Sequence, residues 1–192
     1  MGIMPITLSG SWDEGFALDV HTTSSIFTGE DVYGNPTFDK QYSDMGLLLY
    51  SFKYKYEHDK LFDIIALAKP FIAEWKALTE VDYVLPVPPT KARVFQPAAE
   101  VAREIATIIG AGYSDDILIK KSLTQAKALT DTDKLKIEGT IEKKRDATRE
   151  HDMLLIDDIY KTGTTLNECV KVLRKDQKIK RIYVLTLTKT RT

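Results

Sequence analysis

Apolar residues occur along the chain in short runs that predict the strands of a buried sheet. Met153–Ile156 is a continuous apolar run, which is typical of a strand covered on both faces in a parallel sheet. Runs rich in β-forming residues also occur at Val81–Val87 and Arg181–Leu187, and a shorter one occurs at Ile117–Ile119. The central strands of the fold are therefore predicted at Val81–Val87, Met153–Ile156 and Arg181–Leu187.

Between these runs the apolar period changes to that of a helix. Three helices are predicted before the run at Met153, over the segments 43–53, 59–75 and Pro97–Ile109. Ser43 or Asp44 can cap the first helix. Pro70 should kink or divide the second, and Pro97 suits the first turn of the third. Alternating strands and helices predict an α/β, doubly wound fold with a mainly parallel sheet.

The first 42 residues are less regular than the rest. Phe16, Leu18 and Val20 alternate with polar residues, which predicts a half-buried strand, and a turn at 33–36 precedes another extended piece. We expect a small antiparallel element here, forming a hood or edge on a single domain of residues 1–192 whose α/β core spans 43–192. His21, on the polar face of this strand, is interpreted as a solvated or hydrogen-bonded side chain rather than a ligand.

The composition narrows the class of protein. The chain has 192 residues, which suits one domain, and its 27 basic and 28 acidic side chains leave no general electrostatic footprint for nucleic acid or membranes. Nucleic-acid binding stays open only through a local basic patch. The single cysteine, Cys169, excludes an intrachain disulfide and is interpreted as a packed helix residue. Without a signal-peptide pattern or a membrane-length apolar run, we expect a cytoplasmic protein.

Two acids and a short polar loop follow the run Met153–Ile156 directly. Ionised carboxylates only accept hydrogen bonds, so Asp157 and Asp158 suit the vicinal hydroxyls of a sugar, or a metal ion carried by a phosphorylated ligand. Gly163 lets the backbone of the next loop approach a phosphate closely. The polar members of that loop are Lys161, Thr162, Thr164 and Thr165. The pattern predicts a site for a phosphorylated ribose, against the alternative of an ordinary turn with two chance acids.

A second loop, after Val81–Val87, is basic. Thr90, Lys91 and Arg93 follow two prolines that lack N–H groups, so backbone donors in this loop begin at Thr90. Such a loop at the carboxyl end of a neighbouring parallel strand can hold a pyrophosphate, while a solvated loop is the alternative.

The segment of about residues 121–150 has no sustained apolar period and is rich in basic residues. A long insertion of this kind in a compact domain is more often functional than a plain connection. A solvated β-hairpin with mixed charges is the alternative.

The sequence Leu154 to Thr165 resembles the signature of the type I phosphoribosyltransferases, which bind phosphoribosyl pyrophosphate (PRPP). The stretches Pro86-Val87-Pro88, Lys91, Arg93 to Ala98 and Ala102-Arg103 resemble the ComF-like branch of that family, which is associated with competence and DNA uptake. The chain departs from that branch at Val94 and Gln96, and it lacks the N-terminal four-cysteine zinc ribbon.

The resemblance implies a type I phosphoribosyltransferase fold in which the segment 121–150 closes over PRPP. It implies that Asp157 and Asp158 hold the ribose hydroxyls and take part in catalysis. The 5-phosphate would be held by Lys161, Thr162, Gly163, Thr164 and Thr165, and the pyrophosphate by Thr90, Lys91 and Arg93. Mg²⁺ would be bound through PRPP, with Asp157 and Asp158 as its protein contacts.

The implied reaction transfers the phosphoribosyl group to a nitrogen atom of an acceptor base and releases pyrophosphate. The competing interpretation is a PRPP-binding or competence-associated protein without turnover. A homodimer is a further expectation. In the family's 6-oxopurine enzymes an Asp commonly occupies the position of Lys161, and an ammonium group cannot accept a hydrogen bond from a purine N–H. We therefore expect hypoxanthine and guanine to be poor acceptors.

Overall fold

The computed structural model describes residues 2–89, 95–121 and 139–191, and within them a central sheet has the strand order β1-β2-β10-β9-β5-β6. The strands are β1 (Ile6–Thr7), β2 (Glu14–Val20), β5 (Tyr83–Pro86), β6 (Gly112–Tyr113), β9 (His151–Tyr160) and β10 (Ile179–Lys189). Only β1 is antiparallel to its neighbour; the other pairs are parallel. The predicted mainly parallel sheet is confirmed.

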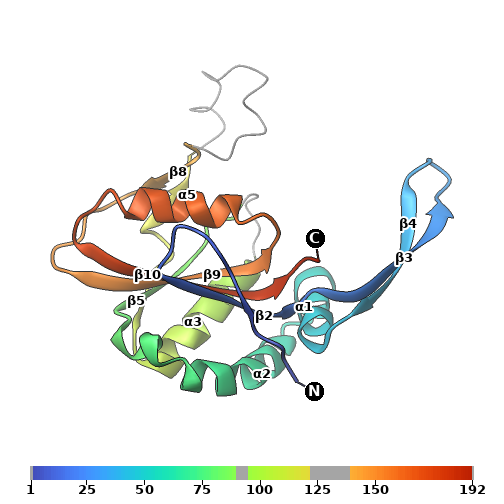
Figure 1. Cartoon of the computed structure of the whole chain (residues 1–192), viewed down its shortest axis with the longest axis horizontal. Helices are drawn as coiled ribbons and strands as arrows, with labels where there is room; N and C mark the ends of the chain where they lie inside the picture. Colours follow the sequence, from blue (N-terminus) through green and yellow to red (C-terminus); the bar gives the residue numbers. More distant parts are fainter. Residues whose placement is uncertain (1, 90–94, 122–138, 192) are drawn as a thin grey trace.

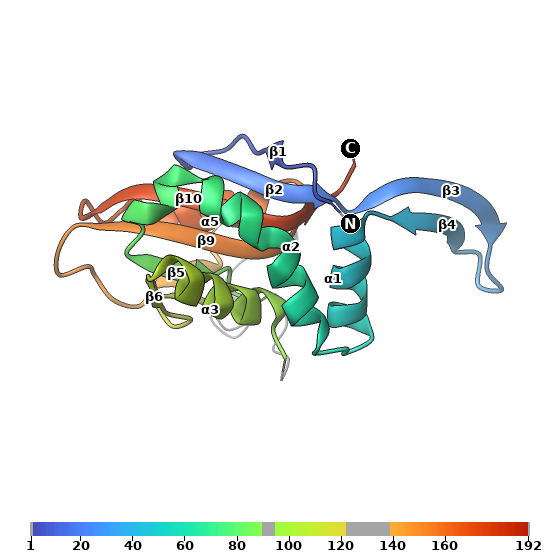
Figure 2. The same cartoon turned by 90° about the horizontal axis from the view of Figure 1, so that it is seen from below.

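Helices cover both faces of this sheet (Figures 1 and 2). The helices are α1 (Asp44–Tyr54), α2 (Lys60–Glu74), α3 (Pro97–Ile109) and α5 (Thr164–Leu173), with a 3₁₀ helix, η1 (Lys76–Glu80), after α2. Buried residues of α1, α2 and α3 share one core with Leu154 and Ile156 of β9. Buried residues of α5 share a second core with Met153 and Leu155 on the opposite face. The α/β doubly wound arrangement is thereby confirmed.

The predicted helices are found close to their expected bounds. Ser43 caps α1, its hydroxyl oxygen accepting a hydrogen bond from the Gly46 N–H at 3.0 Å. Pro97 occupies the first turn of α3, as expected. Pro70 does not divide α2, which is continuous from Lys60 to Glu74. No helix among the described residues is both long and apolar enough to span a bilayer.

The expectation for Phe16–Val20 is wrong in its pairing. These residues belong to β2, which pairs in parallel with β10 in the central sheet and antiparallel with β1. The expected small antiparallel element is present, but residues 22–42 form it. Ala17 and Leu18 are fully buried and Asp19 is nearly so, because both faces of β2 are covered. The alternating pattern predicted one covered face, and it gave no sign of the partner strand, whose paired residues are 169 positions away in the chain.

Two antiparallel strand pairs lie outside the central sheet. β3 (Thr22–Glu30) pairs with β4 (Pro36–Tyr42) in a hairpin that projects from the body of the molecule (Figure 1). β7 (Leu118–Lys120) pairs with β8 (Ile141–Lys143), so part of the predicted 121–150 loop is paired strand. Residues 122–138 of that segment lie outside the described residues.

The chain reverses its direction across the sheet between β5 and β9. From β5 it passes through α3 to β6 on one side, and from β9 it passes through α5 to β10 on the other. In open α/β sheets ligands bind outside the carboxyl ends of the strands at such a switch point. The fold therefore directs attention to the residues that follow Pro86 and to the end of β9.

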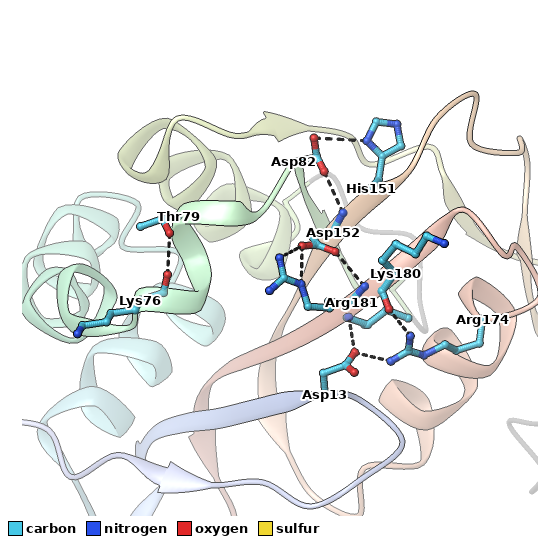
Figure 3. Close-up of polar contacts among 10 residues, drawn as sticks. Asp13, Lys76, Thr79, Asp82, His151, Asp152, Arg174, Lys180 and Arg181 are labelled. Carbon is cyan, nitrogen blue, oxygen red and sulfur yellow. Dashed lines mark hydrogen bonds and ion pairs between the residues drawn. The ribbon is translucent and has the colours of Figure 1, made fainter.

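The amino ends of the same strands are held together by carboxylates (Figure 3). Asp82 accepts a hydrogen bond from the backbone N–H of Asp152 at 2.9 Å, and Asp152 accepts one from that of Arg181 at 3.0 Å. Asp13 accepts one from the N–H of Ile182 at 2.7 Å. Charge-assisted bonds of this kind are stronger than neutral ones, so they fix the register of β5, β9, β10 and β2. This register determines which residues meet at the carboxyl edge.

Close packing at Gly46 holds α1 against the start of the β3–β4 hairpin. A Cβ atom at this position would lie 2.1 Å from the backbone oxygen of His21. We predict that Gly46→Ala lowers the free energy of unfolding by about 1–3 kcal/mol, because the helix must shift to relieve the clash. Urea unfolding measures this change. Gly2→Ala, where a Cβ atom has open space, is the matched control and should have no effect; equal stability of the two variants would contradict the packing.

Candidate functional site at the carboxyl edge of the sheet

The two predicted acids lie within β9 rather than after it. β9 continues to Tyr160 because it stays paired with β10, where Asp157 is opposite Thr186 and Tyr160 is opposite Lys189. The expectation that the strand ends at Ile156 is therefore wrong. Since successive side chains of a strand point to opposite faces, the two acids extend from opposite faces of β9 at the carboxyl edge of the sheet.

Asp158 lies on the face covered by α1 and is held by a lysine of that helix. The Nζ atom of Lys53 lies 2.5 Å from Oδ2 of Asp158, and the two side chains are only 16% and 17% exposed. A partly buried ion pair is screened less by water and salt than a surface pair. This ion pair ties α1 to the end of β9.

Asp157 lies on the face covered by α5, and no ion pair to it is found among the described residues, although the charge of Lys53 acts on it. Its Oδ1 atom accepts a hydrogen bond from the backbone N–H of Asp158 at 2.8 Å. Burial, followed by the charge of Asp158, raises the pKa of Asp157 to about 7. Cys169 is fully buried in α5, which confirms it as a packed helix residue. Burial, followed by the charge of Asp157, raises the pKa of its thiol. The two acids therefore have different surroundings.

His21 and Thr188 lie beside the Lys53–Asp158 pair. The Nδ1 atom of His21 is 3.1 Å from Oγ1 of Thr188, so this imidazole is hydrogen-bonded, as one of the two readings of His21 expected. Burial, followed by the charge of Lys53, lowers the pKa of His21. A neutral imidazole carries no positive charge, so of His21 and Lys53 only Lys53 is a cation beside Asp158.

The predicted phosphate loop leads into the amino end of α5. Gly163 is the N-cap residue with a φ of 73°, and a Cβ atom there would lie 2.7 Å from the Tyr160 hydroxyl. A glycine cap has no side chain to occupy the first helical N–H groups, which therefore remain available to an anion. The hydroxyl groups of Thr162 and Thr164 lie 2.8 Å apart beside them, and Lys161 is exposed.

An open groove of about 730 Å³ extends from this loop over the outer side of α5. It is lined by Ser11, Thr162, Thr164, Asn167, Glu168, Val170, Lys171, Arg174 and Lys175. Asn167 accepts hydrogen bonds from Ser11, and Arg174 pairs with Asp13, so part of this surface is already occupied. Because neither Asp157 nor Asp158 lines it, the groove does not connect the loop with the acids.

The predicted pyrophosphate residues Thr90, Lys91 and Arg93 lie outside the described residues. The strand before them is well placed: Pro86 is opposite Ile156, and the Val87 N–H donates to the Ile156 oxygen at 2.8 Å. The basic loop therefore begins beside the residue that precedes Asp157. This adjacency is the part of the prediction that the fold supports.

The donor set at this edge suits a magnesium ion only if the ligand carries it. Within the described part of the chain no three His, Cys, Asp or Glu side chains are grouped so that they could hold a metal. Asp157 and Asp158 supply carboxylate oxygens, which are the hard ligands that Mg²⁺ prefers, but the rest of its shell must come from substrate and water.

Sequence reasoning assigned no role to Lys53, whose contact with Asp158 spans 105 positions. The only signal was its place in the Phe52-Lys53-Tyr54 stretch, where a lysine interrupts residues that form the end of an amphipathic helix. The side of β9 on which each acid lies was likewise not predicted.

The chain is similar to solved structures of phosphoribosyltransferases. It is 21% identical to a hypoxanthine phosphoribosyltransferase from Staphylococcus aureus, with a TM-score of 0.45, over 67% of this chain and 64% of that one, a little under two thirds of its length. It is 15% identical to an adenine phosphoribosyltransferase from Thermoanaerobacter pseudethanolicus, with a TM-score of 0.45, over 86% of this chain and 94% of that one. It is 13% identical to UMP synthase from Leishmania donovani, with a TM-score of 0.41, over 86% of this chain and 28% of that one. No protein-family model and no curated protein matches the sequence.

The raised pKa of Asp157 predicts how stability depends on pH. The folded protein binds this proton with a pKa of about 7 and the unfolded chain with a value near 3.8, so the folded state binds more protons between these values. Stability from this group is complete below about pH 4 and is lost as the pH rises through 7. Asp157→Asn should therefore raise the free energy of unfolding at about pH 8, by at most ~4 kcal/mol, and leave it nearly unchanged below about pH 4.

Urea unfolding across this pH range measures the effect. Asp158→Asn is the matched control: it leaves Lys53 without its partner and should lower stability at about pH 8. An unchanged pH dependence in Asp157→Asn would show that Asp157 is ionised without penalty.

Proposed function

We propose that the chain is a phosphoribosyltransferase that binds PRPP and transfers its phosphoribosyl group to a nitrogen acceptor with release of pyrophosphate. One observation carries the proposal: an acid pair and a glycine-capped helix follow one another on β9 and α5, beside the switch point of a parallel sheet. A carboxylate pair accepts from hydroxyls and a free helix N-terminus binds phosphate. A ribose 5-phosphate group has both hydroxyls for the carboxylates and a phosphate for the helix N-terminus.

The 5-phosphate would bind at the amino end of α5. The N–H groups after Gly163 and the hydroxyls of Thr162, Thr164 and Thr165 are its donors, and the helix dipole favours its charge. Lys161 is exposed beside this loop, where it can add a positive charge. No acidic residue lies in the first turn of α5 to oppose an anion.

The ribose hydroxyls would be held by Asp157 and Asp158. Asp158, paired with Lys53, accepts hydrogen bonds as a carboxylate. Asp157 is half-protonated near neutral pH and can accept or donate. Binding of a cationic, oxocarbenium-like sugar centre favours the ionised form of both, so the acids would stabilise the transition state by charge.

The pyrophosphate would be held by Thr90, Lys91 and Arg93, whose loop follows the strand next to β9. Mg²⁺ bound with PRPP, within reach of Asp157 or Asp158, would offset the negative charge of the pyrophosphate as it leaves. Positioning of the acceptor nitrogen opposite C1 accounts for the remaining catalysis.

The branch and the acceptor belong to the same proposal. We infer a ComF-like member, from the sequence resemblance, with an acceptor other than hypoxanthine or guanine, from Lys161. We also propose a cytoplasmic location, as expected from the sequence.

The first test is ligand-induced stabilisation. PRPP with magnesium should raise the melting temperature by about 5–10 °C at a hundredfold excess over Kd, because it binds only the folded state. The double variant Asp157→Asn, Asp158→Asn should show no shift. Lys175→Ala, in the groove over α5, is the control and should keep it. A shift lost in Lys175→Ala but kept in the acid variant would move the ligand to the groove.

Pyrophosphate release with a panel of free bases separates turnover from binding. Release with a base that carries a carboxylate, and little with hypoxanthine or guanine, is the expected result. A thermal shift without release for any base would favour a PRPP-binding protein without transferase turnover.

A further inference from the structure

A second cavity, here called the amino-edge cavity, lies at the other end of the strands from the candidate site. Its volume is about 560 Å³, which is within the range of small-molecule sites. Its floor is formed by Tyr83, His151, Met153 and Ile179, from the first residues of β5, β9 and β10. Since a strand rises about 3.3 Å per residue, His151 lies about 20 Å along β9 from Asp157. The amino-edge cavity is therefore separate from the candidate site.

The floor of the cavity is largely apolar, and its rings are held in place. Met153 and Ile179 belong to the core shared with α5, and Tyr83 packs against that core. The rings of Tyr83 and His151 meet edge to face with their centroids 5.2 Å apart. On its other side the Tyr83 ring lies so close to Gly112 that a Cβ atom there would be 2.7 Å from it. A rigid floor of this kind suits a flat, apolar ring system.

His151 brings an unused nitrogen atom to this floor. Its side chain is only 9% exposed, and its Nδ1 atom has no hydrogen-bond partner among the described residues, with Oδ1 of Asp82 3.5 Å away (Figure 3). A carboxylate at this distance favours the proton of a neutral imidazole on Nδ1, which leaves Nε2 as an acceptor. Figure 3 shows Nε2 on the side of the ring away from Asp82, and His151 lines the cavity whereas Asp82 does not. The ring thus presents an acceptor to the cavity.

The charged groups around the cavity disfavour an anionic ligand. Two basic side chains line it, and acids already pair with both. The Nζ atom of Lys143 lies 2.8 Å from Oδ1 of Asp146 and also pairs with Asp176, while Arg145 pairs with Asp116. A phosphate or carboxylate group would have to replace an acid in one of these pairs, so the ligand should be neutral or cationic.

Asp115, on the exposed side of the cavity, can still accept hydrogen bonds. Among the described residues its carboxylate receives one, from the Tyr113 hydroxyl at 3.1 Å, and a carboxylate has room for about four. The cavity therefore offers one ring nitrogen on an apolar floor and one carboxylate at its exposed end. Its ligand should carry a donor on a flat ring system and further donors at its other end.

We propose that the amino-edge cavity binds a purine nucleoside whose base carries an exocyclic amine. The two rings of the base lie on the floor, where the amine donates a hydrogen bond to Nε2 of His151. The vicinal hydroxyls of the sugar donate to Asp115. None of these contacts uses a residue assigned to PRPP, so the inference does not rest on the proposed function.

Calorimetric titration of the full chain with adenosine and with guanosine tests the proposal. At least one of them should bind at a single site with a Kd on the order of 100 µM, which is the efficiency expected for a ligand of this size. The double variant Asp157→Asn, Asp158→Asn should bind it equally well, because the cavity lies at the other end of β9. This variant separates the cavity from the candidate site.

Matched ligands test the contact with His151. Inosine lacks the exocyclic amine of both probes and should bind about tenfold more weakly than the tighter of them, because Nε2 is then left without a donor. His151→Phe keeps a ring on the floor but removes the acceptor, so it should lower the affinity about tenfold and abolish the preference over inosine. Near-ultraviolet circular dichroism checks that this variant is folded.

The sugar contact has its own pair of measurements. The 2′-deoxynucleoside of the same base lacks one of the vicinal hydroxyls and should bind several-fold more weakly to the unmodified chain. Asp115→Ala, at an exposed position that should not affect folding, should remove this difference. Asp39→Ala, which removes an exposed acid of β4, is the matched control and should leave both preferences intact.

Three results would overturn the proposal. They are the absence of saturable binding of both adenosine and guanosine, a preference over inosine that persists in His151→Phe, and binding that is lost in the double acid variant. The last of these would place the nucleoside at the carboxyl edge of the sheet. Because no titration contains PRPP, these results leave the proposed transferase function undecided.

Discussion

Two carboxylates, Asp157 and Asp158, lie near the end of strand β9, whose preceding residues are buried on both faces. The groups that compensate these two charges determine the rest of the site. A buried charge without a partner is costly, so each acid needs its own solution. Lys53 reaches from α1 to Asp158, while Asp157, on the side of α5, has its pKa raised by burial and by its neighbour. The two acids thus lie on two faces of the sheet and have different surroundings.

The two edges of the sheet have different roles. At the amino edge, Asp13, Asp82 and Asp152 are satisfied by backbone N–H groups of the next strand, so this edge fixes the register. At the carboxyl edge the same register places Pro86 beside Ile156, and the chain leaves β5 and β9 in opposite directions. The Gly46 contact holds α1 where Lys53 can reach across. The residues that fix the register and the residues of the candidate site therefore lie at opposite ends of the strands. Helix α1 connects the candidate site with the base of the β3–β4 hairpin.

Local patterns predicted much of this fold, and long-range pairings account for what they missed. Ser43 and Pro97 marked helix starts because capping and proline geometry depend on neighbouring residues alone. The run Met153–Ile156 predicted β9, but not its continuation to Tyr160, which depends on pairing with β10. For the same reason the parallel pairing of β2 with β10 was not predicted, whereas the antiparallel element expected in this region is formed by β3 and β4. In the candidate site, residue order proposed Asp157, Asp158 and Gly163, whereas Lys53 could be found only once α1 was placed against β9.

A crystal structure of the chain with ribose 5-phosphate would test the central claim most directly. The account predicts a phosphate within hydrogen-bond distance of the N–H groups of Thr164 and Thr165, with the ribose hydroxyls on Asp157 or Asp158. Lys53 should keep its contact with Asp158 in that complex. A phosphate bound among Lys171, Arg174 and Lys175, with the sugar directed away from both acids, would contradict it.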